Sequence, residues 1–208
     1  MKRDEKNYLS KKRILESAFK EFGEKGYGLS SVNNICASGE ISKGILYHYF
    51  KDKDELYLEC VRELFNGLTA FLKTSFKNID KTKPSALEEY FNLRYKYFSQ
   101  NIYHHKLFCD IAIAPPQHMT ERIKELRKDF DYLNIVVIEE LLQNIHLRDD
   151  ISVEATVETL RLYLDFINVR YQMVLDSKID LEKYEQTCMR SLSILLYGIV
   201  ERKEEIVS

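Results

Sequence analysis

Apolar side chains recur every three or four residues along almost the whole of this chain, and this spacing is what most constrains its fold. A clear stripe near the amino terminus consists of Ile14, Leu15, Ala18, Phe19 and Phe22. These positions share one face of a helix but no single face of a strand. Only 7 Gly and 3 Pro interrupt the 208 residues, so long helices meet few breakers. The sequence predicts an all-α fold of about nine helices.

Three short helices are expected in the first quarter of the chain. Gly26 is suited to end the first helix in a left-handed conformation. Ser30 is a candidate cap for the second helix, and Gly39 ends that helix after about two turns. Ser42 is a candidate cap for the third, which runs through Phe50. Because such short helices do not stand alone, we expect them to share one core as a helix-turn-helix.

Residues 54–208 are expected to form a larger helical domain behind a first domain of residues 1–53. Capping boxes formed by Asp52 with Glu55 and by Ser85 with Glu88 predict the starts of two helices. Further helices are expected up to the last two, which carry apolar residues on two sides and so need two partners. A homodimer with a symmetric interface would supply the second partner, and a bundle closed within one chain is the alternative. The predicted interface residues are Leu160, Leu164, Leu192, Leu195, Leu196 and Ile199.

The charge is unevenly distributed between these two parts. Residues 1–53 hold 11 Lys and Arg against 7 Asp and Glu, and the rest holds 20 against 26, in a chain of net charge −2. A basic first part and an acidic second part indicate different partners.

The third predicted helix has a face suited to DNA. Leu46 and Phe50 face its core, while Lys43, Gly44, Tyr47 and His48 lie on the opposite side. Lys43 or His48 can donate to guanine edges and Ile45 can contact a thymine methyl group. Hydroxyls of Ser42, Tyr47 and Tyr49, and the ammonium of Lys53 at a helix start, suit phosphates. The alternative is an ordinary three-helix unit whose aromatic cluster is core, but four adjacent rings cannot all face one core from a short helix.

Two stretches carry a family resemblance: Leu29-Ser30-Ser31-Val32, and Ile41-Ser42-Lys43-Gly44-Ile45-Leu46-Tyr47-His48-Tyr49-Phe50 followed by Lys51-Asp52-Lys53-Asp54-Glu55-Leu56. Together they resemble the DNA-binding segment of the tetracycline-repressor (TetR) family of bacterial regulators, over about the first 60 residues. The resemblance implies DNA contacts by Ser30, Ser31, Ser42, Lys43, Gly44, Tyr47, His48, Tyr49 and Lys53. It also implies a ligand-binding and dimerisation domain in the remainder. One departure is Gly39-Glu40, where the family has Ala-Gly, so Glu40 is expected to be strained or the left-handed residue displaced.

Aromatic residues crowd the second part, and a ligand cavity would use the same residue types as a core. Our candidates for contacts with a small, largely apolar effector are Phe91, Arg94, Tyr95, Phe108, Phe130, Phe166 and Arg170.

Several other classes find little support. His105 and Cys109 are spaced for one helix face, but we expect no metal site, because His118 lies beyond the helix break at Pro115-Pro116. No catalytic motif and no cofactor motif is present, so we expect neither an enzyme nor a cofactor. Two alternatives stay open: an all-helical enzyme acting on an apolar small molecule, against which this absence counts, and a DNA-binding protein without ligand sensing. The charged start, and the lack of a run of about 18 apolar residues, predict a cytoplasmic protein that does not bind membranes.

Overall fold

The computed structural model describes residues 3–83, 85–175 and 181–199, and all of its regular elements are helices. In chain order they are α1 (Arg3–Leu29), α2 (Val32–Ser38), α3 (Lys43–Tyr49), α4 (Lys53–Phe76), α5 (Ala86–Ser99), α6 (Ile102–Ile113), the 3₁₀ helix η1 (Gln117–Met119), α7 (Thr120–Leu142), α8 (Val153–Leu175) and α9 (Leu181–Ile199). The all-α prediction, with nine α-helices in the described part, is confirmed. None of the described helices combines the length and apolar character that a membrane crossing requires.

The chain folds into two compact units, one of Met1–Leu68 with Phe98–Asp129 and one of Thr69–Tyr97 with Phe130–Ser208. The helices α4 and α7 each contribute residues to both units. The first unit therefore holds the expected helix-turn-helix and also α6, which packs along α1. We keep the division into residues 1–53 and 54–208 as a proposal for where two functions separate, since the compact units are defined by packing.

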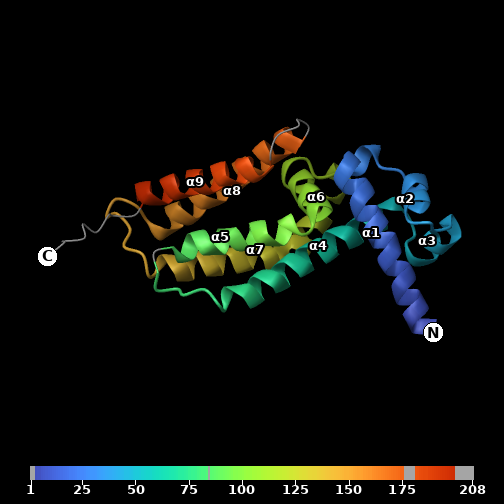
Figure 1. Ribbon diagram of the computed structural model, residues 1–208, viewed down its shortest axis with the longest axis horizontal. Coiled ribbons are helices and arrows are strands. Elements are labelled where there is room, and N and C mark those ends of the chain that lie inside the picture. Colours follow the sequence, from blue (N-terminus) through green and yellow to red (C-terminus); the bar gives the residue numbers. More distant parts are fainter. Residues whose placement is uncertain (1–2, 84, 176–180, 200–208) are drawn as a thin grey trace. The chain divides into compact units, whose positions relative to one another are not determined.

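In the first unit, α2 and α3 lie beside α1 (Figure 1). Ile14 and Phe22 of α1, Ile35 of α2 and Leu46 of α3 are completely buried, so the three helices share one core as expected. Gly26 has φ 66° and breaks the regular course of α1, as the sequence predicted. The positive φ is one that a residue with a Cβ atom rarely adopts.

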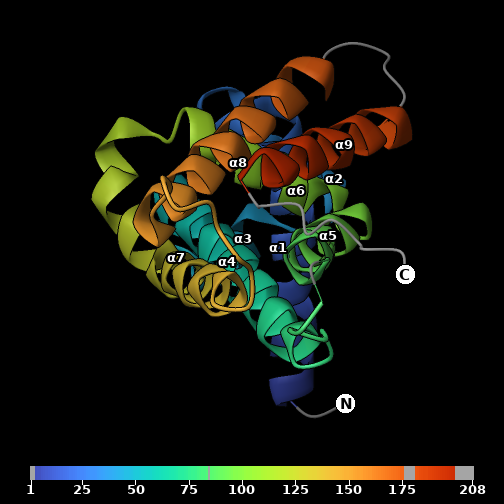
Figure 2. The same cartoon turned by 90° about the vertical axis from the view of Figure 1, so that its left-hand side faces the viewer.

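The second unit contains α5, α8, α9 and the larger part of α7. The helices α8 and α9 lie side by side in both views (Figure 1, Figure 2). Ser152 caps α8, because its hydroxyl accepts a hydrogen bond from the Ala155 amide at 3.1 Å. The predicted capping box of Ser85 with Glu88 is wrong, because the Ser85 hydroxyl donates its hydrogen bond to the carboxylate of Glu89, at 2.8 Å.

Candidate DNA-binding interface

Helix α3 presents a polar and aromatic face away from its core. Its amino-terminal cap is Ser42, whose hydroxyl accepts a hydrogen bond from the Ile45 amide at 3.2 Å. Leu46 is completely buried, whereas Ile45 is 45% and Tyr47 50% exposed. His48 is also exposed. This helix of seven residues thus buries one side chain in the core and exposes its other face to solvent, as the sequence predicted. The contacts of its residues with DNA stay predictions.

Helix α2 begins one residue later than the sequence suggested. Its cap is Ser31, whose hydroxyl accepts from the Asn33 amide at 3.2 Å. Ser30 is buried, and its hydroxyl donates to the carbonyl of Tyr27 at 2.7 Å. The prediction that Ser30 caps α2 is therefore wrong, because the first serine holds the end of α1 and the second satisfies the amides of α2.

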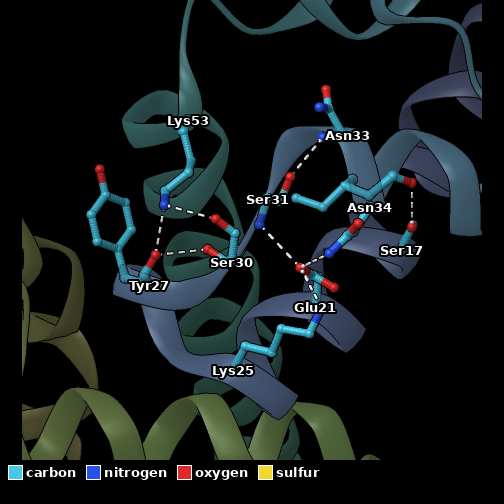
Figure 3. Close-up of polar contacts among 10 residues, drawn as sticks. Ser17, Glu21, Lys25, Tyr27, Ser30, Ser31, Asn33, Asn34 and Lys53 are labelled. Carbon is cyan, nitrogen blue, oxygen red and sulfur yellow. Dashed lines mark hydrogen bonds and ion pairs between the residues drawn. The ribbon is translucent and has the colours of Figure 1, made fainter.

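The start of α2 is also held by Glu21, which sequence reasoning missed. Its carboxylate accepts hydrogen bonds from the Ser31 amide, the Asn34 side chain and Lys25, each at 3.0 Å (Figure 3). Burial raises the pKa of this carboxyl, but the hydrogen bonds from Asn34, Lys25 and Ser31 outweigh burial and bring the pKa below its ordinary value. The available signal was an acidic residue on the buried stripe of α1, where a charge needs partners.

The turn between α2 and α3 explains the departure at Gly39-Glu40. The Glu40 amide donates to the Ala37 carbonyl and the Ile41 amide to the Cys36 carbonyl, at 3.3 and 2.9 Å. This paired arrangement is the Schellman motif, which requires a left-handed residue at the position of Glu40. Glu40 has φ 52°, the only positive φ of a non-glycine residue in the described chain. The expected strain is thus at Glu40.

Gly39 has a different role in the turn. Its φ of −87° suits any residue, but an added Cβ atom would lie 2.6 Å from Ile41 Cδ1 and 3.1 Å from Ser17 Cβ. The glycine therefore permits close packing of the turn against α1.

Two predicted phosphate ligands already have partners within the protein. The Lys53 ammonium donates to the carbonyls of Tyr27 and Ser30, at 2.7 and 3.0 Å, and lies 4.2 Å from the centre of the Tyr27 ring (Figure 3). The Tyr49 hydroxyl lies 3.2 Å from both the carbonyl and the side-chain oxygen of Asn7. Their phosphate contacts stay predictions, and the structure adds a second, structural role for each.

The candidate effector residues do not all share one unit. Phe91 and Phe130 are buried in the second unit, where the Arg94 guanidinium lies 5.8 Å from the centre of the Phe130 ring. Tyr95 is 39% exposed and Phe166 60% exposed. Phe108 belongs to the first unit, where it packs against Phe65 and Phe98. The side chain of Arg170 lies outside the described residues.

The predicted dimer residues lie mostly inside the protomer. Leu160, Leu192 and Leu196 are between 0% and 7% exposed, so a partner chain cannot reach them in this arrangement, and Leu195 is half-buried. The side chains of Leu164 and Ile199 lie outside the described residues. Other apolar residues of these two helices are open to solvent, with exposed fractions between 58% and 68% for Leu162 and Phe166 of α8 and for Ile194 and Tyr197 of α9. The periodicity identified two apolar sides of these helices, and the side it assigned to a partner includes residues that are buried within the protomer.

Comparison with known proteins identifies relatives that regulate transcription. Residues 14–60 match the family described as bacterial regulatory proteins, tetR family. The biofilm operon icaADBC negative transcriptional regulator IcaR of Staphylococcus epidermidis is 25% identical over 134 residues, which are 64% of this chain and 68% of that protein. The uncharacterised regulator YuxN of Bacillus subtilis is 30% identical over 118 residues, 56% of this chain and 39% of YuxN. The second match thus spans well under half of the relative.

Solved structures of such regulators resemble the whole fold. The fatty acid degradation regulator FadR of Bacillus halodurans superposes with a TM-score of 0.72 at 16% identity, over 90% of this chain and 98% of that chain. FadR of Bacillus subtilis, solved in complex with stearoyl-CoA, superposes with a TM-score of 0.71 at 17% identity over the same shares of the two chains. At these identities the resemblance concerns the fold.

Proposed function

Because this chain is a member of the TetR family of bacterial regulatory proteins, we propose that it is a ligand-responsive repressor. It binds operator DNA as a homodimer and is released from it by a small, largely apolar effector. The observation that carries the DNA-binding part is the outward face of α3. There Ile45, Tyr47 and His48 reach solvent opposite a buried Leu46, as a helix that enters the major groove requires.

Selection of duplexes from a random pool by the purified full chain tests this part. We expect enrichment of a sequence with two related half-sites, because a two-fold symmetric dimer reads a palindrome. Tyr47→Ala should weaken binding of the selected duplex by about 1–3 kcal/mol. Tyr132→Ala is the matched control, since Tyr132 of α7 is 69% exposed and belongs to the other unit. Equal effects of the two variants would contradict the assignment of α3 to DNA.

Salt dependence separates phosphate contacts from base contacts. Lys43→Ala, if Lys43 neutralises a phosphate, should make the slope of log affinity against log salt shallower by roughly 0.9 per subunit. His48→Ala, if the ring reads a base, should leave this slope unchanged and relax the preference at one position of each half-site. Loss of slope in the His48 variant would assign His48 to phosphate.

The exposed apolar residues Leu162, Phe166, Ile194 and Tyr197 support the homodimer. Water solvates these large apolar side chains of two adjacent helices poorly. The same residues of a second copy would cover them in a symmetric contact. We propose these residues in place of the buried leucines.

The effector is proposed to carry an apolar chain or ring system. Support comes from the aromatic composition of the second unit and from the B. subtilis fatty acid metabolism regulator, which is 25% identical over 158 residues. Stearoyl-CoA, bound by the structural relative, is therefore a suitable first probe, with free CoA as its control. A coupling of roughly 1–3 kcal/mol would weaken operator binding about 5- to 150-fold. If stearoyl-CoA binds and operator affinity does not change, acyl-CoA is not the releasing ligand.

A further inference from the structure

Tyr27 lies at the centre of a group of polar contacts near the start of α2. It follows the break of α1 at Gly26, and its ring lies against the rings of Tyr57 and His118, with centroids 5.1 and 5.4 Å apart. Its carbonyl accepts hydrogen bonds from Lys53 and from the Ser30 hydroxyl. Tyr27 therefore contacts the segment that leads into α2 on one side and the start of α4 on the other.

The tyrosine hydroxyl joins these contacts to two further elements. It donates a hydrogen bond to Asp54 Oδ1, in the first turn of α4. The other oxygen of this carboxylate, Asp54 Oδ2, lies 3.0 Å from His118 Nε2 in η1. Since η1 directly precedes α7, the pair of Asp54 and His118 joins the beginnings of α4 and α7, the two long helices that contribute residues to both compact units.

The protonation states suit these contacts at neutral pH. Burial, and then the hydrogen bond to Asp54, raise the pKa of Tyr27 to about 12, so the hydroxyl keeps its proton. The hydrogen bond from Tyr27, together with the charge of His118, lowers the pKa of Asp54 below its ordinary value. Asp54 is therefore a carboxylate at neutral pH, so the hydrogen bond that its Oδ1 accepts from Tyr27 is charge-assisted, and its Oδ2 is an acceptor within reach of His118 Nε2.

Hydrogen bonds and short covalent links thus connect η1 with α2. They run from His118 to Asp54 and Tyr27, and then by the Tyr27 carbonyl to Lys53 and Ser30. Ser31, the next residue, caps α2 with its hydroxyl and is held by Glu21 through its amide. The steps within Tyr27 and from Ser30 to Ser31 are covalent, and the other steps are direct hydrogen-bond contacts.

We propose that His118 is a positioning residue for DNA binding: through Asp54 and Tyr27 it holds residues 27–31 and the start of α2 in the orientation that meets the operator. The inference rests on the proposed DNA-binding function and adds to it a residue outside the helix-turn-helix. A displacement of the start of α7 would in this way also affect α2, because it would break the contact between His118 and Asp54. The His118 side chain is about half exposed and is not itself expected to contact DNA.

Three variants of the full chain test the proposal. His118→Ala removes the contact, His118→Gln retains an amide donor able to reach Asp54, and Gln117→Ala is the matched control in the same turn of η1. We expect His118→Ala to weaken binding of the selected duplex about three- to tenfold, the effect of one lost hydrogen bond or exposed ion pair. The salt slope should stay unchanged because no phosphate contact is lost. His118→Gln should restore most of the affinity.

Hydrogen exchange in the free protein gives a second readout that does not depend on DNA. In His118→Ala, the peptide covering residues 27–35 should exchange about three times faster or more, while a peptide from α5 should be unaffected. His118→Ala matching Gln117→Ala in affinity or in exchange would overturn the inference. A shallower salt slope would overturn it as well, because His118 would then contact phosphate. Failure of the wild-type chain to select any duplex would instead refute the proposed function, which separates the two failures.

Discussion

Replacing Glu40 by glycine should stabilise the turn between α2 and α3. Glu40 occupies the left-handed position of a Schellman motif with φ 52°. Its side chain is exposed, and none of the hydrogen bonds and ion pairs described above involves it. The substitution therefore removes a backbone penalty at little cost in packing.

The expected size follows from two opposing contributions. A left-handed conformation costs a residue with a Cβ atom roughly 1–2 kcal/mol relative to glycine. Glycine also makes the unfolded chain more flexible, which lowers stability by about 0.4–1 kcal/mol. Removing a negative charge from the carboxyl end of α2 raises the free energy of unfolding by about 0.3 kcal/mol or more. The net expectation is a gain of about 1 kcal/mol, or roughly 2–4 °C in Tm for a chain of this size.

Thermal unfolding of a short series of variants checks the explanation. Glu40→Ala removes the carboxylate but keeps the Cβ atom, so it should gain only the charge contribution. Glu40→Asn should fall between alanine and glycine, because asparagine tolerates the left-handed region. Gly39→Ala should instead lose about 1–3 kcal/mol, since its Cβ atom would crowd Ile41 and Ser17. If Glu40→Gly raises Tm no more than Glu40→Ala does, the backbone conformation of Glu40 does not destabilise the protein and the explanation is wrong.

Three further predictions concern burial. Tyr57→Phe should raise the free energy of unfolding by about 1 kcal/mol, because the buried Tyr57 hydroxyl has no hydrogen-bond partner among the described residues; a lower Tm would refute this. Ile194→Glu should yield monomers in sedimentation with the helical circular dichroism retained, whereas Leu192→Glu should destabilise the fold by several kcal/mol, about 3 or more; the same behaviour of both would contradict the assigned faces. Burial lowers the pKa of His104 to about 4, so the unfolded chain binds more protons between about pH 6.5 and 4, and stability should fall as pH falls through that window. His104→Phe should flatten this pH dependence, and an unchanged dependence would show that another group is responsible.

The outward face of α3 was predictable from the local sequence pattern. Ser42, Leu46 and Phe50 have the spacing of a capped helix with one buried side, and this spacing leaves Tyr47 and His48 outside. Structure and expectation agree here because a seven-residue helix against a small core has few ways to orient its residues.

The faces of α8 were not predictable in the same way. Leu160 and Leu162 are equally apolar, but Leu160 is buried within the protomer and Leu162 is 64% exposed. Periodicity shows that two sides are apolar and does not say which neighbour each side meets. That choice depends on how helices from distant parts of the sequence pack together.

Helix periodicity, capping and turn chemistry act over four or five neighbours, so the helices, most of their ends and the outward face of α3 could be predicted from the sequence. The contacts of Glu21, Lys53 and His118 could be recognised only in the folded chain. Apart from Lys25, which is four residues from Glu21, their hydrogen-bond partners lie between 10 and 64 residues away along the chain. A carboxylate, an ammonium or an imidazole looks the same in a sequence whether it faces water or a buried carbonyl. Its role is set by the groups that folding brings within hydrogen-bonding distance of it.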